Sequence, residues 1–160
     1  MQNFSRPPFF PMMIDISGKE ILIIGGGRVA SRRAETLLRC GAKITAVSLN
    51  FREDFPEVYK KITRPFNPDD VQEKFSLVIA ATNDREINKL ICSAAKSKKI
   101  PVNVCDNQSE CDFFFPSLIN VENIAVSVCT AGRDVILTRK LSDKLRKILP
   151  SWVKNLTPHS

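Results

Sequence analysis

The chain has 160 residues, of which 43% are hydrophobic, which is enough for one well-formed core and short for two. Lys and Arg number 24 against 17 Asp and Glu, and the formal net charge of +7 favours an anionic ligand, a nucleic acid or an acidic membrane surface. Because the positive charges are spread along a chain with one Tyr and one Trp, the composition argues against nucleic acid.

The N-terminal apolar stretch and the cysteines bear on the cellular compartment. The stretch "FFPMMI" at residues 9–14 is short, is broken by Pro11 and is followed at once by Asp15. A membrane helix needs roughly 20 apolar residues, and no stretch of this sequence approaches that length. The five cysteines include no CxxC pair, which favours reduced thiols in a cytoplasmic protein that has no membrane partner.

The first predicted elements come from "EILIIGGGRVASRRAETLLRCGAKITAV", residues 20–47. Residues 20–24 are apolar on both faces, as a strand buried on both sides should be. Residues 28–40 then have a helical period that ends at Gly41, and residues 43–47 read as a second buried strand. This order predicts the βαβ unit of an open parallel sheet.

The glycines of this unit match the dinucleotide-binding pattern. Gly25 would make the tight turn, Gly27 would let the backbone approach a pyrophosphate, and Ala30 would let the helix pack on the strand. The pyrophosphate would then rest on the helix N-terminus, at Arg28 and Val29. A glycine turn that merely joins a strand to a helix is the alternative, and we weight the nucleotide interpretation above it.

The end of the second strand lacks the acidic residue that usually binds the ribose of NAD. The stretch "ITAVSLN" places Ser48, Leu49 and Asn50 there, and we expect Ser48 and Leu49 to contact the cofactor. A hydroxyl and an amide can bond a ribose without charge, and they discriminate less against the 2′-phosphate of NADP. The sequence therefore does not decide between NAD and NADP.

The alternation of strands and helices continues to about residue 104. It predicts a strand at 61–64, a helix at 68–74, a strand at 77–81, a helix at 85–98 and a strand at 101–104. The predicted fold class is therefore α/β, a Rossmann-type doubly wound parallel sheet over residues 1–110.

After residue 110 the pattern changes. The stretches "CDFFFPSLI" and "IAVSVCT" read as extended, and "DVILTRKLSDKLRKIL" is amphipathic. Its apolar stripe is predicted to contain Val135, Leu137, Leu141, Leu145 and Ile148. Two strands and a helix bury little by themselves, so we expect an α+β dimerisation segment over residues 111–150 and a flexible tail over 151–160.

Polar residues follow two of the predicted strands, at the sheet edge where ligands bind. After "LVIAA" come Thr82 and Asn83, which we expect at the cofactor, and Asp84, which could equally be a helix N-cap. After "VNVC" comes Asp106, whose carboxylate could act as a general base or orient a cation. A turn-forming role for Asp106 is an alternative at roughly even odds.

Four blocks of the sequence together resemble the precorrin-2 dehydrogenase family. They are "FFPMMIDISGKEILIIGGGRVASRRAETLLRCGAKITAVS", "LVIAATND", "VNVCDNQSECDFFFPS" and "IAVSVCTAGRDVILTRKLSDKLRKILP". This family is the module that makes sirohydrochlorin for siroheme, alone or fused to a methyltransferase, and it sometimes also inserts Fe²⁺. The family motif "NVVD" corresponds to residues 103–106, which places the family's catalytic aspartate at Asp106.

The resemblance implies an NAD-dependent oxidoreductase that converts precorrin-2 to sirohydrochlorin as a homodimer. Asp106 would remove or steer a proton, and Asn103, Thr130 and Arg133 would contact the substrate. The buried run at residues 102–104 predicts that Asp106 lies at the carboxyl end of a central strand. The positive net charge suits the carboxylates of precorrin-2, which Arg28, Arg85 and Arg133 are candidates to clamp. No metal site is expected, because the only histidine is His159, and the chelatase activity stays open.

The chain departs from the family at one turn, where Thr130 replaces a serine and Asp134-Val135 replaces a Ser-Pro pair. An alternative function of another class is a regulatory module that senses NAD(H) and does no chemistry. Such a module needs the glycine turn but not the later blocks, so the later blocks favour the enzyme.

Overall fold

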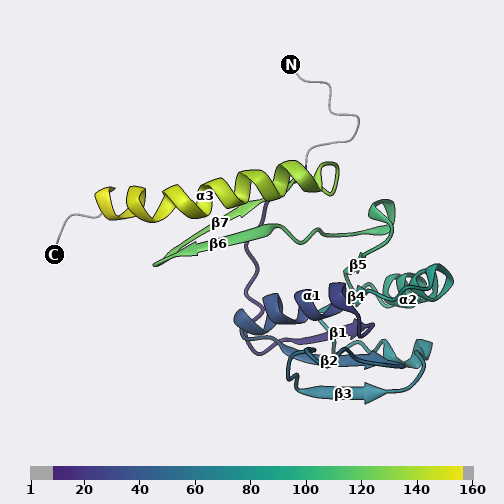
Figure 1. The fold of residues 1–160 in the computed structure, drawn as a ribbon. Coiled ribbons are helices and arrows are strands. Elements are labelled where there is room, and N and C mark those ends of the chain that lie inside the picture. The colour runs from purple at the N-terminus through teal and green to yellow at the C-terminus, as the bar shows by residue number, and fades with distance from the viewer. Residues whose placement is uncertain (1–8, 157–160) are drawn as a thin grey trace. The chain divides into compact units, whose positions relative to one another are not determined.

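The computed structural model describes residues 9–156 (Figure 1). Residues 1–8 and 157–160 lie outside the described residues, and with them His159 and the end of the predicted tail. The chain divides into two compact units, Met1–Phe113 and Phe114–Ser160, which are described separately below.

The first unit is built on a five-stranded sheet with the order β3-β2-β1-β4-β5, and every neighbouring pair is parallel. The strands are β1 Glu20–Ile24, β2 Lys43–Ser48, β3 Lys60–Thr63, β4 Leu77–Ala80 and β5 Val102–Val104. β1 pairs with both β2 and β4. From β1 the chain adds β2 and β3 on one side of the sheet and then β4 and β5 on the other, so the switch point lies between β1 and β4. In open α/β sheets, ligands bind at the carboxyl ends of the strands at such a switch point.

Two helices complete this unit, α1 Arg28–Arg39 and α2 Arg85–Ser97. Right-handed crossovers from β1 to β2 and from β4 to β5 run in opposite directions along the sheet, which places the two helices on opposite faces. The core cluster on the α2 face includes Leu22, Val78 and Val102 from the sheet and Ile91 and Ala95 from α2. The predicted Rossmann-type, doubly wound α/β fold is confirmed.

The predicted helix at 68–74 is wrong. Only one 3-10 turn forms, η1 Pro68–Asp70, which is capped by the Asn67 side chain. The backbone of Val71 is already extended, at φ −77° and ψ 101°, so the helix cannot continue. Val71 and Phe75 are both buried, and their four-residue spacing resembles a helical repeat although an irregular segment carries them.

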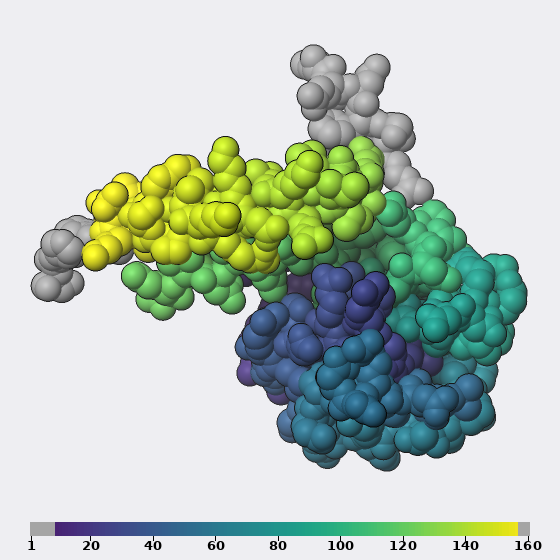
Figure 2. All heavy atoms as spheres, viewed as in Figure 1, coloured from purple at the N-terminus to yellow at the C-terminus, as the bar shows by residue number. Residues whose placement is uncertain are grey.

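The second unit contains an antiparallel pair of strands, β6 Ser117–Val121 and β7 Ile124–Val128, and the long helix α3 Val135–Leu156. This is the small α+β segment that the sequence predicts. Ser142 and Val153 of α3 are buried, whereas Val135, Leu137 and Leu141 of the predicted apolar stripe are exposed in the single chain. In Figure 2, no other segment of this unit covers α3 on the face shown.

α3 extends through Pro150 to Leu156, so residues 151–156 are helical where a flexible tail was expected. A proline inside a helix removes the hydrogen bond that its own N–H would donate, but the chain on either side can stay helical when packing holds it. Val153, on the turn after the proline, supplies such packing because it is 4% exposed. None of the helices in residues 9–156 has the length and apolar character to cross a membrane.

Candidate functional site

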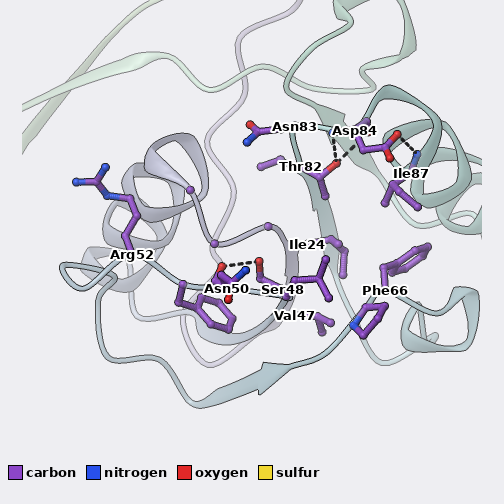
Figure 3. Close-up of a pocket in the computed structure, with 17 residues that line it drawn as sticks. Ile24, Val47, Ser48, Asn50, Arg52, Phe66, Thr82, Asn83, Asp84 and Ile87 are labelled. Atoms are coloured by element: carbon purple, nitrogen blue, oxygen red, sulfur yellow. Dashed lines mark hydrogen bonds between the residues drawn. The ribbon is translucent and has the colours of Figure 1, made fainter.

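A cavity of about 560 Å³ opens at the carboxyl ends of β1, β2 and β4 (Figure 3). It lies at the switch point of the sheet, where the sequence places the cofactor. Its walls come from the glycine turn, the ends of β2 and β4, and the loops after β2 and β3. The lining residues include Gly25, Gly26, Gly27, Ser48, Leu49, Asn50, Arg52, Phe66, Thr82, Asn83 and Asp84.

Two of the three glycines are required by close backbone contacts. Gly25 has a φ of +127°, and a Cβ atom there would lie 2.3 Å from the carbonyl oxygen of Ala81. A Cβ atom on Gly26 would lie 2.1 Å from the carbonyl oxygen of Asn50. The dinucleotide-binding pattern gives no role to Gly26, because only the packing of the loop after β2 reveals the contact.

Gly27 is different, because a Cβ atom there would meet nothing within 4 Å. Gly27 is the N-cap of α1, no side chain caps this helix end, and its first turn contains no acidic residue. The first N–H groups of a helix have no partner within the helix, so the exposed residues Arg28 and Val29 present backbone donors to an anion. Ala30 is fully buried and packs α1 on the sheet.

The end of β2 carries no carboxylate. The Ser48 hydroxyl donates a hydrogen bond of 2.7 Å to the carbonyl oxygen of Asn50, which shapes the loop next to the glycine turn. Leu49 also lines the cavity and is 61% exposed, so it is free to pack against a ligand. Ser48 and Leu49 therefore lie where the sequence places them.

The end of β4 supplies Thr82, Asn83 and Asp84 to the same cavity. Asp84 caps α2, because its carboxylate accepts hydrogen bonds from the N–H groups of Glu86 and Ile87. The helix-cap interpretation of Asp84 is thereby confirmed. Thr82 donates to Oδ1 of Asn88, a fully buried residue that the sequence analysis did not single out.

Asp106 lies two residues after β5, which is an edge strand, so the expected position at the end of a central strand is wrong. The sequence cannot reveal this, because strand order depends on pairing between distant segments. Its carboxylate Oδ1 lies 3.3 Å from Nη1 of Arg85, the first residue of α2. The turn after β5 is closed by the backbone, because the N–H of Asn107 donates a hydrogen bond of 3.3 Å to the carbonyl oxygen of Val104.

Arg85 also bonds Glu110, at the end of the 3-10 turn η2 Gln108–Glu110. The hydrogen bond from Arg85 to Glu110 is the main reason that the pKa of this guanidinium is raised. Arg85 therefore binds carboxylates of its own chain, in place of the substrate carboxylates for which it was a candidate. Neither Arg85 nor Asp106 lines the cavity; the ion pair ties Asp106 to the residue that follows Asp84 in the chain.

Asn103 is 4% exposed, and its amide donates a hydrogen bond of 2.9 Å to the carbonyl oxygen of Phe113. Because Asn103 is buried, its side chain is closed to a substrate in this conformation. Nearby, burial raises the pKa values of the Cys105 and Cys111 thiols, so both stay protonated near neutral pH. These cysteines act as small, half-buried groups.

Thr130 and Arg133 belong to the second unit, in the turn before α3. The Thr130 hydroxyl lies 2.9 Å from that of Thr138 and accepts a hydrogen bond from the N–H of Asp134. Asp134 in turn accepts a hydrogen bond of 2.7 Å from the N–H of Leu137, so it caps α3. Arg133 is exposed. Asp134, which replaces the serine of the family's Ser-Pro pair, thus serves as the N-cap of α3.

A glycine turn between a buried strand and an uncapped helix, next to a cavity at the switch point of a parallel sheet, defines a dinucleotide-binding Rossmann domain. The family model described as "Putative NAD(P)-binding" matches residues 12–117, and the chain belongs to this family. The residues around the cavity fit an NAD-type cofactor, because the helix N-terminus and the open side of Gly27 leave donors and space for a pyrophosphate.

The chain is also similar to siroheme synthases. It is 38% identical over 158 residues to the siroheme synthase of Nitrosomonas eutropha, which covers 95% of this chain and 33% of that protein. With the siroheme synthase of Photorhabdus laumondii it shares 36% identity over 148 residues, covering 89% of this chain and 31% of the relative. The chain thus spans about a third of the length of these curated relatives.

Among solved structures, SirC, a precorrin-2 dehydrogenase, has a similar fold. The TM-score is 0.76, the sequence identity is 22%, and the similarity covers 91% of this chain and 76% of SirC. At this identity the likeness shows the fold, including the two strands and the helix that follow the Rossmann unit.

Proposed function

We propose that the chain catalyses the NAD-dependent dehydrogenation of precorrin-2 to sirohydrochlorin in siroheme biosynthesis. The observation that carries the proposal is the similarity to siroheme synthases over 95% of the chain, which includes both the cavity and Asp106. The fold shared with SirC supports it.

In this mechanism the N–H groups at the start of α1 hold the pyrophosphate, and Gly27 leaves room for it. The bound dinucleotide supplies the acceptor for a hydride. Asp106 accepts the accompanying proton, so that a CH–CH bond of the macrocycle becomes a double bond as one hydride and one proton leave. Arg85 holds the Asp106 carboxylate in place.

The alternative function is a module that senses NAD(H) without catalysis. The ion pair between Asp106 and Arg85 favours the enzyme, because the turn after β5 is closed by the backbone hydrogen bond from Asn107 to Val104 and does not need the Asp106 carboxylate.

One assay separates the two functions. The protein is mixed with precorrin-2 and NAD⁺, and absorbance is followed for reduced nicotinamide together with the sirohydrochlorin spectrum. Stoichiometric appearance of both supports the enzyme, and binding of NAD⁺ without turnover supports the sensor. Adding Fe²⁺ after turnover is complete and following the siroheme spectrum tests the chelatase activity in the same sample.

We further propose that the protein is a cytoplasmic homodimer. Support for the dimer comes from α3, which exposes Val135, Ile136, Leu137 and Leu141 near its start. Exposed apolar side chains that lie close together are typical of an interface, and a two-fold dimer would bury the same surface twice. The five thiols form no disulfide in the structure, which agrees with a reducing compartment.

A further inference from the structure

The loop after β2 brings one cation to the cavity. Within residues 9–156, Arg52 and Asp84 are the only charged residues that line it. Asp84 is engaged as the cap of α2, so Arg52 is the charged group that remains for a ligand. Figure 3 shows Arg52 on the opposite side of the cavity from Phe66 and Ile87.

The backbone holds Arg52 close to the glycine turn. Its N–H donates a hydrogen bond of 3.0 Å to the carbonyl oxygen of Gly26. The loop is anchored by Phe55, which is 4% exposed and meets the ring of Phe51 edge to face, with the ring centroids 4.9 Å apart. The backbone of Arg52 is therefore held in a fixed position in the loop that follows Ser48 at the end of β2.

The end of β2 is where a Rossmann domain meets the adenosine ribose. A carboxylate at this position accepts hydrogen bonds from the ribose hydroxyls and repels a 2′-phosphate. Ser48 stands there instead, and its hydroxyl already donates to the carbonyl oxygen of Asn50. Ser48, Leu49 and Asn50 at this strand end carry no negative charge that would repel an added phosphate.

The Arg52 guanidinium is oriented by the carboxylate of Asp54. Two hydrogen bonds of 2.7 and 2.8 Å join them side by side, and both side chains are largely exposed. Exposed ion pairs of this kind contribute little to folding stability, and their side chains exchange partners readily. A phosphate can replace Asp54 with the same paired geometry, because guanidinium binds phosphate as well as it binds carboxylate.

We propose that Arg52 binds the 2′-phosphate of NADP⁺, so that this cavity accepts NADP⁺ as well as NAD⁺, and that Asp54 competes with the phosphate for Arg52. Lys61 adds a second positive charge near the site, since its Nζ lies 5.7 Å from the ring centroid of Phe51, which lines the cavity. The inference rests on the cofactor site of the proposed function. It assigns the choice between NAD⁺ and NADP⁺ at that site to Arg52 and Asp54.

Calorimetric titration of the full chain with NAD⁺ and with NADP⁺ tests the proposal. We expect the dissociation constant for NADP⁺ to lie within about tenfold of that for NAD⁺. Arg52→Gln should weaken NADP⁺ binding by about tenfold or more and leave NAD⁺ binding within about twofold, because only the phosphate contact is lost. Asp54→Asn should strengthen NADP⁺ binding, since it removes the competing carboxylate.

Arg39→Gln is the matched control, because Arg39 is an exposed arginine in the last turn of α1 that does not line the cavity. It should change neither affinity. The proposal is overturned if NADP⁺ binds more than about tenfold weaker than NAD⁺, or if Arg52→Gln weakens both coenzymes alike. If NAD⁺ itself does not bind, the cofactor site of the proposed function fails, and this inference fails with it.

Discussion

Nη1 of Arg85 lies 3.3 Å from Oδ1 of Asp106, although 21 positions separate the two residues in the sequence. Arg85 begins α2, directly after the Asp84 that lines the cavity, and Asp106 follows β5. The parallel pairing of β4 with β5 brings the two strand ends together. The ion pair thus connects the cavity wall to the candidate catalytic carboxylate.

The role of Asp106 is tested by Asp106→Asn, which keeps the size of the side chain and removes the base. We expect turnover of precorrin-2 to fall by roughly 10²–10⁴-fold, the usual cost of losing general acid–base catalysis, with NAD⁺ affinity unchanged. Stopped-flow absorbance measures the first quantity and calorimetry the second. Normal turnover would make Asp106 a structural residue, and joint loss of turnover and NAD⁺ binding would move it to the cofactor site.

Arg85 is predicted to position Asp106. Arg85→Gln should lower kcat by about tenfold and leave NAD⁺ affinity unchanged, because a carboxylate freed from its partner spends less time in the productive position. Arg85→Lys should recover only part of kcat, since an ammonium group lacks the fork that binds Asp106 and Glu110 together. A wild-type kcat in Arg85→Gln would show that the ion pair has no role in turnover.

The glycine turn allows a matched pair of variants. Gly27→Val should abolish NAD⁺ binding and leave the melting temperature of the ligand-free protein nearly unchanged, because the added side chain enters open space that the pyrophosphate would occupy. Gly26→Ala should instead destabilise the fold by about 1–3 kcal/mol, because its Cβ atom meets the backbone of Asn50. Unchanged NAD⁺ affinity in a folded Gly27→Val protein would show that the glycines only join a strand to a helix and do not bind the cofactor.

The lowered pKa of Asp70 predicts that the free energy of unfolding depends on pH. Partial burial acts to raise its pKa, but the hydrogen bonds from Arg64 and from the N–H of Asn67 outweigh burial and lower it below the ordinary value. A lowered folded-state pKa contributes stability above the unfolded value of about 3.9, and this contribution is lost as the pH falls further. Asp70→Asn should therefore cost about 1–3 kcal/mol at pH 7 and progressively less below pH 4.

Urea unfolding at a series of pH values measures the effect of Asp70. Asp69→Asn is the control, because Asp69 is exposed and next to Asp70 in η1. It should leave the pH dependence of unfolding as in the parent chain. An Asp70→Asn variant with unchanged stability at pH 7 would contradict the prediction.

The proposed dimer is tested on α3. Sedimentation of the parent chain should give twice its mass of 18.0 kDa. Ile136→Lys, at a side chain that is 69% exposed, should shift the protein to a monomer without unfolding it, because the charge has to be buried only in the dimer. Lys147→Gln, at an exposed position about three turns further along α3, should leave the dimer intact. A parent chain that sediments as a monomer would refute the dimer.

Features governed by local rules could be predicted from the sequence of this protein. The strand, glycine turn and helix at residues 20–40 were predictable because buried strands and amphipathic helices have characteristic apolar patterns. The same holds for the α2 helix and for the cavity edge at Ser48, Thr82 and Asn83, since parallel strands end at one edge of a sheet.

Tertiary structure alone decided the features that depend on contacts between distant segments. The need for glycine at position 26 comes from the Asn50 carbonyl, and the partner of Asp106 is an arginine on another element. The edge position of β5 and the irregular path from Val71 to Phe75 likewise follow from strand order and core packing. Local patterns carry little information about such contacts, because their free energy arises only when the chain brings the segments together.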